Sequence, residues 1–438
     1  MKVLKFGGTS VGSPQRMKDV AKLITDGERK IVVLSAMSGT TNTLVEISDY
    51  LHKKNPDGAN EVINRLENKY KQHINELFST EEYRQKGMEL LKVRFELLRS
   101  YTKDLFTLFE ERIVLAQGEL LSTTMVNYYL QEQGVKSVLL PALDFMRTDK
   151  NAEPDLPYIK ERLAQQLEAN PDAEIYITQG FICRNAYGEV DNLQRGGSDY
   201  SASLIGAAVK ADEIQIWTDI DGMHNNDPRI VDKTSPVRHL HFEEAAELAY
   251  FGAKILHPTC IQPAKYANIP VRLLNTMDPK AEGTMISNET EKGKIKAVAA
   301  KENITAIKIK SSRMLLAHGF LRKVFEIFEK YQTSIDMICT SEVGVSVSID
   351  NTKHLNEILD ELRKYGTVTV DHNMCIVCVV GDLEWENVGF EAKALDAMRD
   401  IPVRMISFGG SNYNISFLVR ECDKKAALQS LSDQLFNN

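Results

Sequence analysis

Short apolar runs alternate with segments of helical periodicity over the first 290 or so residues. Six of these runs, rich in Val, Ile and Leu, predict strands: Val3–Phe6, Ile31–Ser35, Ser137–Leu140, Glu174–Gln179, Glu213–Asp219 and Pro270–Leu274. Continuous apolar runs are typical of parallel strands that helices cover on both faces. Residues Phe181 to Val190 predict a hairpin that turns around Asn185 to Gly188. The pattern predicts an α/β domain over residues 1–290, with a mostly parallel open sheet sandwiched by helices.

A helical insert is predicted within this domain, from about Asn60 to Gly134. One apolar stripe steps by three and four residues along Ile63, Leu66, Tyr70, Ile74 and Leu77. A second stripe steps in the same way along Leu91, Phe95, Leu98, Thr102, Leu105 and Phe109. Such one-sided stripes are typical of amphipathic helices whose apolar face forms core. We therefore expect a helical lobe packed on the sheet.

The composition changes after about Ser287, where SNETEKGKIK is polar and charged and predicts a linker. Beyond it, one pattern occurs twice at a spacing of about 70 residues. The first copy runs from strand Thr305–Lys310 through a helix, two strands and a helix to strand Val368–Asp371. The second runs from strand Met374–Val380 through a helix and two strands to a final helix. The order is that of two ferredoxin-like modules, over residues 303–372 and 373–438.

The charge and hydropathy of the chain limit its function class. Its 438 residues carry 53 Lys and Arg against 61 Asp and Glu, a formal charge of −8. Nucleic-acid-binding proteins normally present a basic face, so no nucleic-acid partner is expected. The apolar runs are shorter than the roughly 18 residues of a membrane helix, and the N-terminus lacks the apolar run of a secretory signal. The sequence predicts a cytoplasmic protein with no membrane partner.

Cys375 and Cys378 are the only two of the six cysteines that lie close together in the sequence. Their C-x-x-C spacing is also that of half a zinc site or of a redox pair. No second such pair or paired His accompanies them, and they lie in an apolar run that predicts a strand. Residues three apart in a strand point to opposite faces. We therefore expect two buried, reduced thiols, and we assign no metal ligand to the protein.

Two glycine loops follow predicted strands and offer sites for an anion. No G-x-G-x-x-G, Walker A or protein-kinase signature is present. In KFGGTS, which starts at Lys5, two glycines let backbone N–H groups approach a phosphate beside the lysine charge. In RGGSDYSAS, which starts at Arg195, Ser198 is expected to cap a helix and the guanidinium matches a carboxylate. Both loops are also compatible with ordinary strand–helix turns. Because ligands of open α/β sheets bind at the carboxyl ends of strands, the two loops together favour a ligand site.

The segment WTDIDGMHNNDPRIV follows another predicted strand. It offers Thr218, Asp219 and Asp221 to a nucleotide or its magnesium, and Arg229 to a phosphate. The alternative is a turn-forming loop, since Asp, Asn, Gly and Pro are common in turns.

Two charged residues lie in less polar surroundings. Glu119 is part of a helical pattern, where a carboxylate either pairs with a substrate ammonium or faces solvent. Lys254 lies in FGAKILHP, an otherwise apolar stretch, which favours a functional lysine.

Seven motifs follow one another along the chain: KFGGTSV at Lys5, SAMSGTTN at Ser35, QGELLS at Gln117, TQGFI at Thr178, RGGSDYSA at Arg195, WTDIDG…DPR at Trp217 and FGAKILHP at Phe251. Taken in this order, they resemble the aspartokinase family. The resemblance implies the amino acid kinase fold followed by two ferredoxin-like ACT domains. MLLAHGFL at Met314 and SIDMICTSEV at Ser334 are most similar to the lysine-sensitive monofunctional type.

The resemblance implies that ATP, with Mg²⁺, phosphorylates the side-chain carboxylate of L-aspartate to give 4-phospho-L-aspartate, the first step toward lysine, threonine and methionine. It implies catalytic roles for Lys5, Asp199 and Lys254. The implied nucleotide contacts are Lys5, Phe6, Gly7, Gly8, Thr218, Asp219, His224, Arg229, Lys254 and Ile255. The implied aspartate contacts are Thr41, Glu119, Arg195, Gly196, Gly197 and Ser198. Because a carboxylate of pKa near 4 is ionised at neutral pH, no general base is needed.

The resemblance also implies feedback inhibition by lysine, bound between ACT domains of two chains in a homodimer or larger assembly. The implied effector contacts are Met314, Phe320, Leu321, Ile335, Asp336, Ser341 and Glu342. Asp336 and Glu342 suit a ligand with two ammonium groups. Two positions depart from the family pattern: His224 replaces an aromatic, often Tyr, and Ala317 replaces a hydroxyl.

Two other functions stay open. A relative that phosphorylates glutamate or carbamate would share the first glycine loop, but it is expected to lack paired ACT modules. A non-catalytic amino-acid sensor would share the ACT modules. The joint presence of Lys5, Glu119, Arg195 and Asp219 argues against a sensor, which has no use for them together.

Overall fold

The computed structural model describes residues 1–193, 196–253, 256–311 and 318–436. The chain forms two compact units. The first comprises Met1–Met223 and Ile255–Asn288, and the second comprises His224–Lys254 and Glu289–Asn438. Within the described ranges, none of the helices combines the length and the apolar character needed to span a lipid bilayer.

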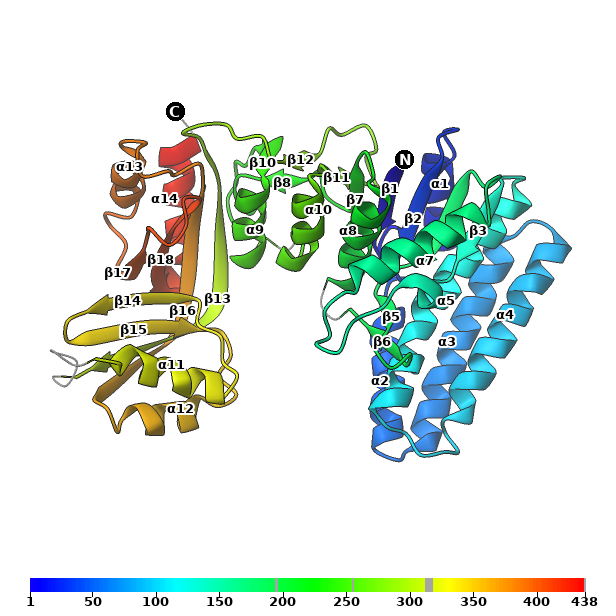
Figure 1. Ribbon diagram of the computed structural model, residues 1–438, viewed down its shortest axis with the longest axis horizontal. Helices are drawn as coiled ribbons and strands as arrows, with labels where there is room; N and C mark the ends of the chain where they lie inside the picture. Colours follow the sequence, from blue (N-terminus) through cyan, green and yellow to red (C-terminus); the bar gives the residue numbers. More distant parts are fainter. Residues whose placement is uncertain (194–195, 254–255, 312–317, 437–438) are drawn as a thin grey trace. The chain divides into compact units, whose positions relative to one another are not determined.

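The first unit is built on an open, mostly parallel sheet (Figure 1). Neighbouring strands follow the order β12 (Thr284–Ser287), β11 (Val271–Asn275), β7 (Ile214–Thr218), β1 (Lys2–Phe6), β2 (Lys30–Leu34), β4 (Ile175–Gln179) and β3 (Ser137–Leu140). All pair in parallel except β11 and β12. All six strands that the sequence predicts are present, each within one residue of its expected bounds. Every residue of β2 is buried, because helices cover both faces.

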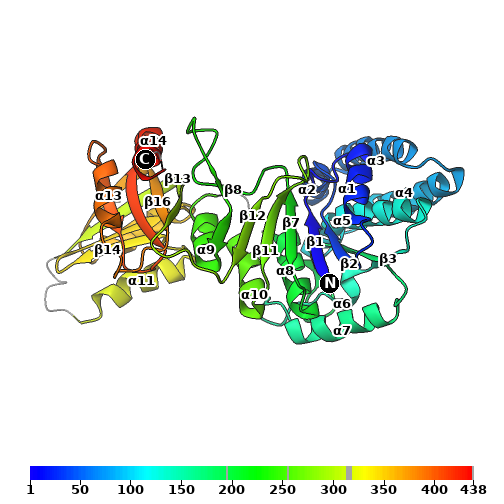
Figure 2. The same cartoon turned by 90° about the horizontal axis from the view of Figure 1, so that it is seen from above.

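Helices lie on both sides of this sheet (Figure 2). One side carries α1 (Pro14–Ile24), α2 (Thr40–His52), α3 (Pro56–Leu77), α4 (Glu81–Ser100) and α5 (Leu108–Glu132). The other carries α6 (Ala142–Phe145), α7 (Leu156–Glu168), α8 (Gly197–Val209) and α10 (Ile261–Ala267), which follows a 3₁₀ turn at Pro258–Cys260. Leu4, Phe6, Val32 and Leu34 pack from the sheet into one core with α1 to α5. A hairpin of β5 (Ile182–Arg184) and β6 (Val190–Asn192) confirms the predicted turn.

The helical insert is confirmed as α3, α4 and α5, with one correction. The first predicted stripe, from Ile63 to Leu77, is buried along its whole length. The second stripe is buried only from Leu91 to Leu98. Helix α4 ends at Ser100, and Leu105 is exposed in the loop before α5. Thr107 caps α5 with a capping box, which explains why the helical period cannot continue through this segment.

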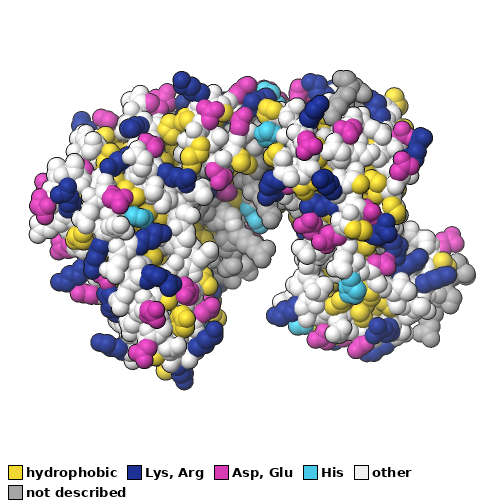
Figure 3. Space-filling view, turned by 180° about the vertical axis from the view of Figure 1, so that it is seen from behind, with side chains coloured by type: hydrophobic (Ala, Val, Ile, Leu, Met, Phe, Trp, Pro, Cys, Tyr) yellow, Lys and Arg dark blue, Asp and Glu magenta, His cyan; other side chains and the backbone are white. Residues whose placement is uncertain are grey.

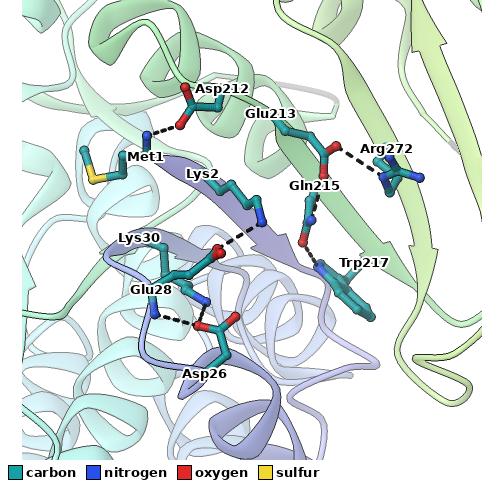
Figure 4. A network of polar contacts seen from close by, with 10 residues as sticks. All are labelled: Met1, Lys2, Asp26, Glu28, Lys30, Asp212, Glu213, Gln215, Trp217 and Arg272. Carbon is teal, nitrogen blue, oxygen red and sulfur yellow. Dashed lines mark hydrogen bonds and ion pairs between the residues drawn. The ribbon is translucent and has the colours of Figure 1, made fainter.

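Ion pairs and hydrogen bonds tie together the amino-terminal ends of the strands (Figure 4). Lys2 pairs with Glu28 at 2.9 Å, and Lys30 pairs with Asp26. On the other side of β1, Arg272 of β11 pairs with Glu213 at 3.3 Å. This network fixes one end of the sheet, and the carboxyl ends of the same strands face the opposite way, where the glycine loops begin.

The second unit contains a six-stranded antiparallel sheet. Its strands follow the order β14 (Met337–Ser341), β15 (Gly344–Ile349), β13 (Ile295–Lys310), β16 (Thr367–Gly381), β18 (Asn414–Arg420) and β17 (Val403–Ser407). Two helices, α11 (Phe320–Lys330) and α12 (Leu355–Leu362), pack on β13 and β15 in one core. Two others, α13 (Phe390–Ala397) and α14 (Lys424–Phe436), form a second core with β16 and β18. The unit also contains β9 (Pro236–Val237), β10 (His239–His241) and α9 (Phe242–Tyr250), while β8 (Met223–His224) crosses the unit boundary.

Two long strands are shared by the two ferredoxin-like modules. Residues 304–310 of β13 pair with residues 367–374 of β16 in the first module, whereas residues 295–301 pair with residues 376–381 in the second. The second module therefore takes its fourth strand from the chain that precedes the first module. The predicted linker SNETEKGKIK is partly wrong for the same reason, since Ile295 and Lys296 already belong to β13.

Cys375 and Cys378 are both buried and both unbonded in β16, as predicted. Burial raises the pKa of both thiols. On the face of the molecule shown in Figure 3, basic and acidic side chains are intermixed, and no large area carries a single sign of charge.

Candidate active site

A cavity of about 560 Å³ lies in the first unit at the carboxyl ends of β1 and β2. The start of α2, the middle of α5 and the start of α8 complete its wall. It brings together eight residues singled out from the sequence: Lys5, Gly8, Thr41, Glu119, Gly196, Gly197, Ser198 and Asp199. These residues lie up to 194 positions apart in the chain, so the fold alone assembles them.

Lys5 and Asp199 form an ion pair in this cavity. The Lys5 ammonium lies 2.7 Å from Asp199 Oδ1, and both side chains are largely buried. A Cβ on Gly7 would lie 3.4 Å from Lys5 Nζ, so the glycine leaves the ammonium room beside the backbone. Asp199 lies in the first turn of α8, where the helix dipole also stabilises its charge. The pair therefore holds a cation at the end of β1.

Two glycines, Gly8 and Gly196, bring the backbone close around the cavity. A Cβ on Gly8 would lie 2.9 Å from the carbonyl oxygen of Ala36, which fixes the β1 loop against the β2 loop. Gly196 has φ +69°, and a Cβ there would lie 2.4 Å from His257. Because Gly196 is the N-cap of α8, Ser198 lies inside the helix and the prediction that Ser198 caps it is wrong.

Glu119 is a buried carboxylate with no counter-charge among the residues that the structure describes. Its side chain comes from the middle of α5, and the residue is 4% exposed. Oε1 accepts a hydrogen bond from the backbone N–H of Ala36 at 3.3 Å, and Oε2 has no partner. Burial raises the pKa of Glu119 to about 7. Such a group is stabilised by an incoming cation, because a buried charge needs a partner.

The helix that carries Glu119 is fixed tightly to the β2 loop. A Cβ on Gly118 would lie 2.7 Å from the Cβ of Ala36, so only glycine allows this approach. The Ser122 hydroxyl donates to the carbonyl of Ser35 at 2.7 Å. The Gln179 amide donates to Thr123 Oγ1 at 2.8 Å, joining α5 to β4. These bonds set where the Glu119 carboxylate enters the cavity.

The start of α2 forms the remaining wall. Gly39 precedes the helix in the left-handed region with φ +82°, and no side chain caps the first turn. Helix N-termini favour anions because their first N–H groups lack intrahelical partners. Behind this turn, the buried Thr40 hydroxyl and the Tyr70 hydroxyl lie 2.9 Å apart.

Sequence analysis missed several residues of this wall, all of which line the cavity: Thr9, Ser35, Ala36, Met37, Ser38, Gly39, Asn42 and Phe181. Most belong to the SAMSGTTN motif, from which only Thr41 was selected. The position of this motif after a buried strand was the signal that could have found them.

The predicted nucleotide contacts are distributed over both units. Thr218 and Asp219 end β7, the strand beside β1, and Asp219 is exposed. The Phe6 side chain is fully buried and stacks on Trp217 at 5.6 Å, so only its backbone faces the loop. In the second unit, His224 Nδ1 lies 2.9 Å from Thr234 Oγ1, and Arg229 pairs with Asp227 at 2.7 Å. Arg195, Lys254 and Ile255 lie outside the described residues.

The predicted effector contacts occupy different environments in the second unit. Phe320 is buried in the core of the first module, and Leu321 is 38% exposed on α11. Ser341 and Glu342 are exposed at the turn between β14 and β15. Ile335 and Asp336 precede β14, and Asp336 is paired with Lys301. Met314 and Ala317 lie outside the described residues.

The described part of the chain contains no group of three or more His, Cys, Asp or Glu side chains placed to bind a metal ion. Mg²⁺ commonly binds through one or two carboxylates together with phosphate oxygens and water, so such a group is not a requirement for magnesium.

Comparison with known proteins identifies both parts of the chain. The model of the amino acid kinase family matches residues 1–275, and an ACT domain model matches residues 377–435. The chain is 34% identical to aspartokinase 1, chloroplastic, of Arabidopsis thaliana over 471 residues, covering all of this chain and 80% of the relative. It is 33% identical to lysine-sensitive aspartokinase 3 of Escherichia coli, covering 99% of each. The crystal structure of E. coli aspartokinase III in complex with aspartate and ADP superposes with a TM-score of 0.86 at 33% identity, covering 100% of both chains. The predicted fold class is confirmed.

Proposed function

The chain belongs to the aspartokinase family, and from this premise we propose that the cavity binds L-aspartate and transfers the γ-phosphoryl group of ATP to its side-chain carboxylate. The products are 4-phospho-L-aspartate and ADP. The proposal rests on one observation: the carboxylate of Glu119 and the ammonium of Lys5 line the same cavity. One oxygen of Glu119 has no partner among the described residues.

Glu119 provides the site for the substrate ammonium. An amino acid carries a positively charged ammonium, and the buried Oε2 of Glu119 has no hydrogen-bond partner among the described residues. The α-carboxylate needs cationic or N–H donors, and we assign this role to Arg195. The first turns of α2 and α8, which line the cavity, offer further N–H donors. Thr41 and Ser198 add hydroxyl groups on the same wall. The side-chain carboxylate is then the part of the substrate left to react.

Lys5 acts on the phosphoryl group that is transferred. The attacking carboxylate is ionised at neutral pH, so catalysis needs positioning and charge neutralisation rather than a base. Asp199 is a positioning residue, because its carboxylate holds the Lys5 ammonium 2.7 Å away. Gly7 and Gly8 leave the backbone N–H groups of the loop accessible to phosphate oxygens. Lys254 is proposed as the second catalytic cation.

The nucleotide is assigned to Thr218, Asp219, His224, Arg229 and Ile255, together with Lys5 to Gly8 and Lys254. Asp219 is proposed as a carboxylate for Mg²⁺, because it is exposed just after β7 and is not the partner of Lys5. When bound with ATP, Mg²⁺ would supply positive charge to the phosphate oxygens.

Lysine is proposed as the feedback effector, bound at the ACT modules of a homodimer or larger assembly. Support comes from the relative that is called lysine-sensitive and from the two acidic residues Asp336 and Glu342, which suit a ligand with two ammonium groups. Large apolar side chains are exposed on the second unit, among them Phe325, Ile338 and Phe408, as at surfaces that bind another chain. The boundaries 1–290, 303–372 and 373–438 and the cytoplasmic location stay predictions of the sequence.

The test is product formation with a panel of substrates. Purified protein with Mg-ATP and hydroxylamine is expected to form aspartyl hydroxamate from L-aspartate, and much less hydroxamate from L-glutamate. The longer glutamate side chain displaces its carboxylate when its ammonium is held at Glu119. Turnover of glutamate equal to that of aspartate, or no ATP-dependent product from aspartate, would refute the proposal.

A further inference from the structure

The regulatory unit contains a closed ammonium site around Asp336. The Lys301 ammonium lies 2.8 Å from Asp336 Oδ1 and 2.9 Å from Asp350 Oδ2. The Tyr250 hydroxyl donates to Asp336 Oδ1 at 2.9 Å, and the Tyr250 ring lies 4.5 Å from the Lys301 nitrogen. We call these four residues the ammonium cage.

The ammonium cage contains two carboxylates but only one cation. The Asp336 side chain is 1% exposed, and its Oδ2 is buried with no hydrogen-bond partner in the described part of the chain. Burial raises the pKa of Asp336, which shows that Lys301 does not fully compensate the cost of burying the carboxylate. Asp350 is by contrast 42% exposed and is well solvated without Lys301.

An external ammonium can reach Asp336 only if the cage opens. Because no surface of Oδ2 is accessible, a ligand has to replace one of the groups already in contact. Lys301 is the residue most easily displaced from Asp336, because its ammonium still has Asp350 as an ion-pair partner at 2.9 Å.

The four residues of the ammonium cage come from segments of the second unit that are far apart in the sequence. Tyr250 ends α9, Lys301 lies on β13, and Asp336 and Asp350 flank β14 and β15. Gly252, with φ +115°, packs against the same strand: a Cβ there would lie 2.1 Å from the carbonyl oxygen of Ala300. The segment from Tyr250 to Gly252 is thus fixed to β13 beside Lys301, and in the chain it leads directly to Lys254.

We propose that the ammonium cage is a binding site for an alkylammonium ligand in which Lys301 is the resident occupant, and that the feedback effector binds by displacing the Lys301 ammonium from Asp336 to Asp350. The inference rests on the proposed function, which places the effector at Asp336. One ammonium of the effector replaces the contact that Lys301 makes. The displacement disrupts the link between Lys301 and Tyr250, and so loosens the segment that precedes Lys254.

The experiment measures lysine binding by calorimetry and kinase inhibition by lysine, using the full-length protein and two variants of Lys301. Lys301→Met keeps the length of the side chain but removes its charge, so residue 301 no longer competes with free lysine and the dissociation constant for lysine is expected to fall about fivefold or more. Lys301→Arg places a guanidinium fork between the two carboxylates, and it is expected to raise both the dissociation constant and the half-inhibitory concentration of lysine.

A matched control is Lys424 of α14, whose partner Glu302 lies one residue along β13 from Lys301. Lys424 pairs with Glu302 at 2.6 Å, and its side chain is 18% exposed against 19% for Lys301. Lys424→Met is expected to leave lysine binding unchanged, because this pair does not contact Asp336.

The two opposite shifts separate competition from a structural role. If Lys301 only stabilises the fold, both variants weaken lysine binding, and that result would overturn the inference. Should Lys301→Met not fold, tighter or unchanged lysine binding by Lys301→Arg overturns it equally. If the wild-type protein phosphorylates aspartate but neither binds lysine nor is inhibited by it, the assignment of lysine as the effector is wrong, and the inference fails with it.

Discussion

Two ionisable side chains, Lys5 and Glu119, are buried in the wall of one cavity, and they differ in the partners that offset the cost of burying a charge. Lys5 has its counter-ion within 2.7 Å in Asp199, whereas Glu119 has one backbone N–H and an unpartnered oxygen. A buried cation that is already held by a counter-ion has a fixed position from which it can stabilise a reacting group. A buried carboxylate without a counter-ion is stabilised when a cationic ligand binds to it. This contrast is the basis for assigning catalysis to Lys5 and substrate binding to Glu119.

Replacement of Lys5 tests its catalytic assignment. Lys5→Met is expected to lower kcat by about 10²–10³-fold, as is typical when one electrostatic group at a reacting centre is removed. The KM for aspartate is expected to change much less, because the Lys5 charge acts on the phosphoryl group. Lys2→Met is the matched control, since Lys2 lies on the same strand but pairs with Glu28 outside the cavity. A near-normal kcat in Lys5→Met contradicts the role.

Glu119 also predicts how stability depends on pH in the absence of substrate. Its pKa is raised from 4.5 to about 7 in the folded state, so folding favours the protonated form. Its contribution to stability is therefore complete below the unfolded pKa and is lost as pH rises from about 4.5 to 7. Glu119→Gln removes this loss, and its free energy of unfolding at pH 8 is expected to exceed that of the wild type by about 2–3 kcal/mol. Chemical unfolding at pH 8 and pH 4.5 measures the difference, and a less stable variant at pH 8 would show that Glu119 is compensated.

At the level of secondary structure, helix α5 presents Glu119 to the cavity through close contact at Gly118. Helix propensity alone favours Gly118→Ala by about 1 kcal/mol. The new Cβ, however, would lie 2.7 Å from the Cβ of Ala36, so α5 or the β2 loop has to move. The variant is expected to raise the KM for aspartate because Glu119 moves with the helix.

The control for this variant is Gly410→Ala, where the added Cβ meets nothing within 4 Å and φ is not positive. Steady-state kinetics with aspartate compares the two. An unchanged KM in Gly118→Ala would mean that the packing of α5 against Ala36 does not position the carboxylate.

Elements with one strong local signal were predictable from sequence. Continuous apolar runs identified the parallel strands, and the stripe from Ile63 to Leu77 identified α3. The second stripe failed beyond Leu98 because its period continued by chance through Leu105 and Phe109, where a capped helix start interrupts the chain. Ser198 failed as a cap because Gly196, in a left-handed conformation, takes that position. A residue pattern shows which structure is favoured locally, but here Gly196, two residues before Ser198, determined where α8 begins.

The candidate site was predictable as a set of motifs, but its electrostatics was not. Glu119 and Lys5 were selected from motif and residue type. Only the fold shows that Glu119 is buried with no counter-charge among the described residues and that Asp199 neutralises Lys5, because these facts depend on chain segments far apart in sequence. The contact of Lys301 with Asp336 lay outside sequence reasoning for the same reason.

Over the whole molecule, the sharing of β13 and β16 makes the two ferredoxin-like modules interdependent. Sequence reasoning placed their boundary at residue 373 and left the second module without a fourth strand, which residues 295–301 supply. A fragment of residues 294–438 keeps this strand, and a fragment of residues 303–438 lacks it. The shorter fragment exposes the apolar edge of β16 at Ile376 to Val380 and is expected to aggregate or lose cooperative unfolding.

Circular dichroism and thermal melting of the two fragments test this interdependence. The longer fragment is expected to show a cooperative transition. Equal stability of the two fragments would show that the second module does not depend on residues 295–301.

The central claim for the whole molecule is that aspartate binds through its ammonium to the uncompensated carboxylate of Glu119. The most direct test is the KM for aspartate of Glu119→Gln, which preserves the shape of the side chain and the acceptor for the Ala36 N–H. Loss of a charge-assisted contact is expected to raise this KM about ten- to a hundredfold, while kcat changes far less. An unchanged KM for aspartate in Glu119→Gln would contradict the account.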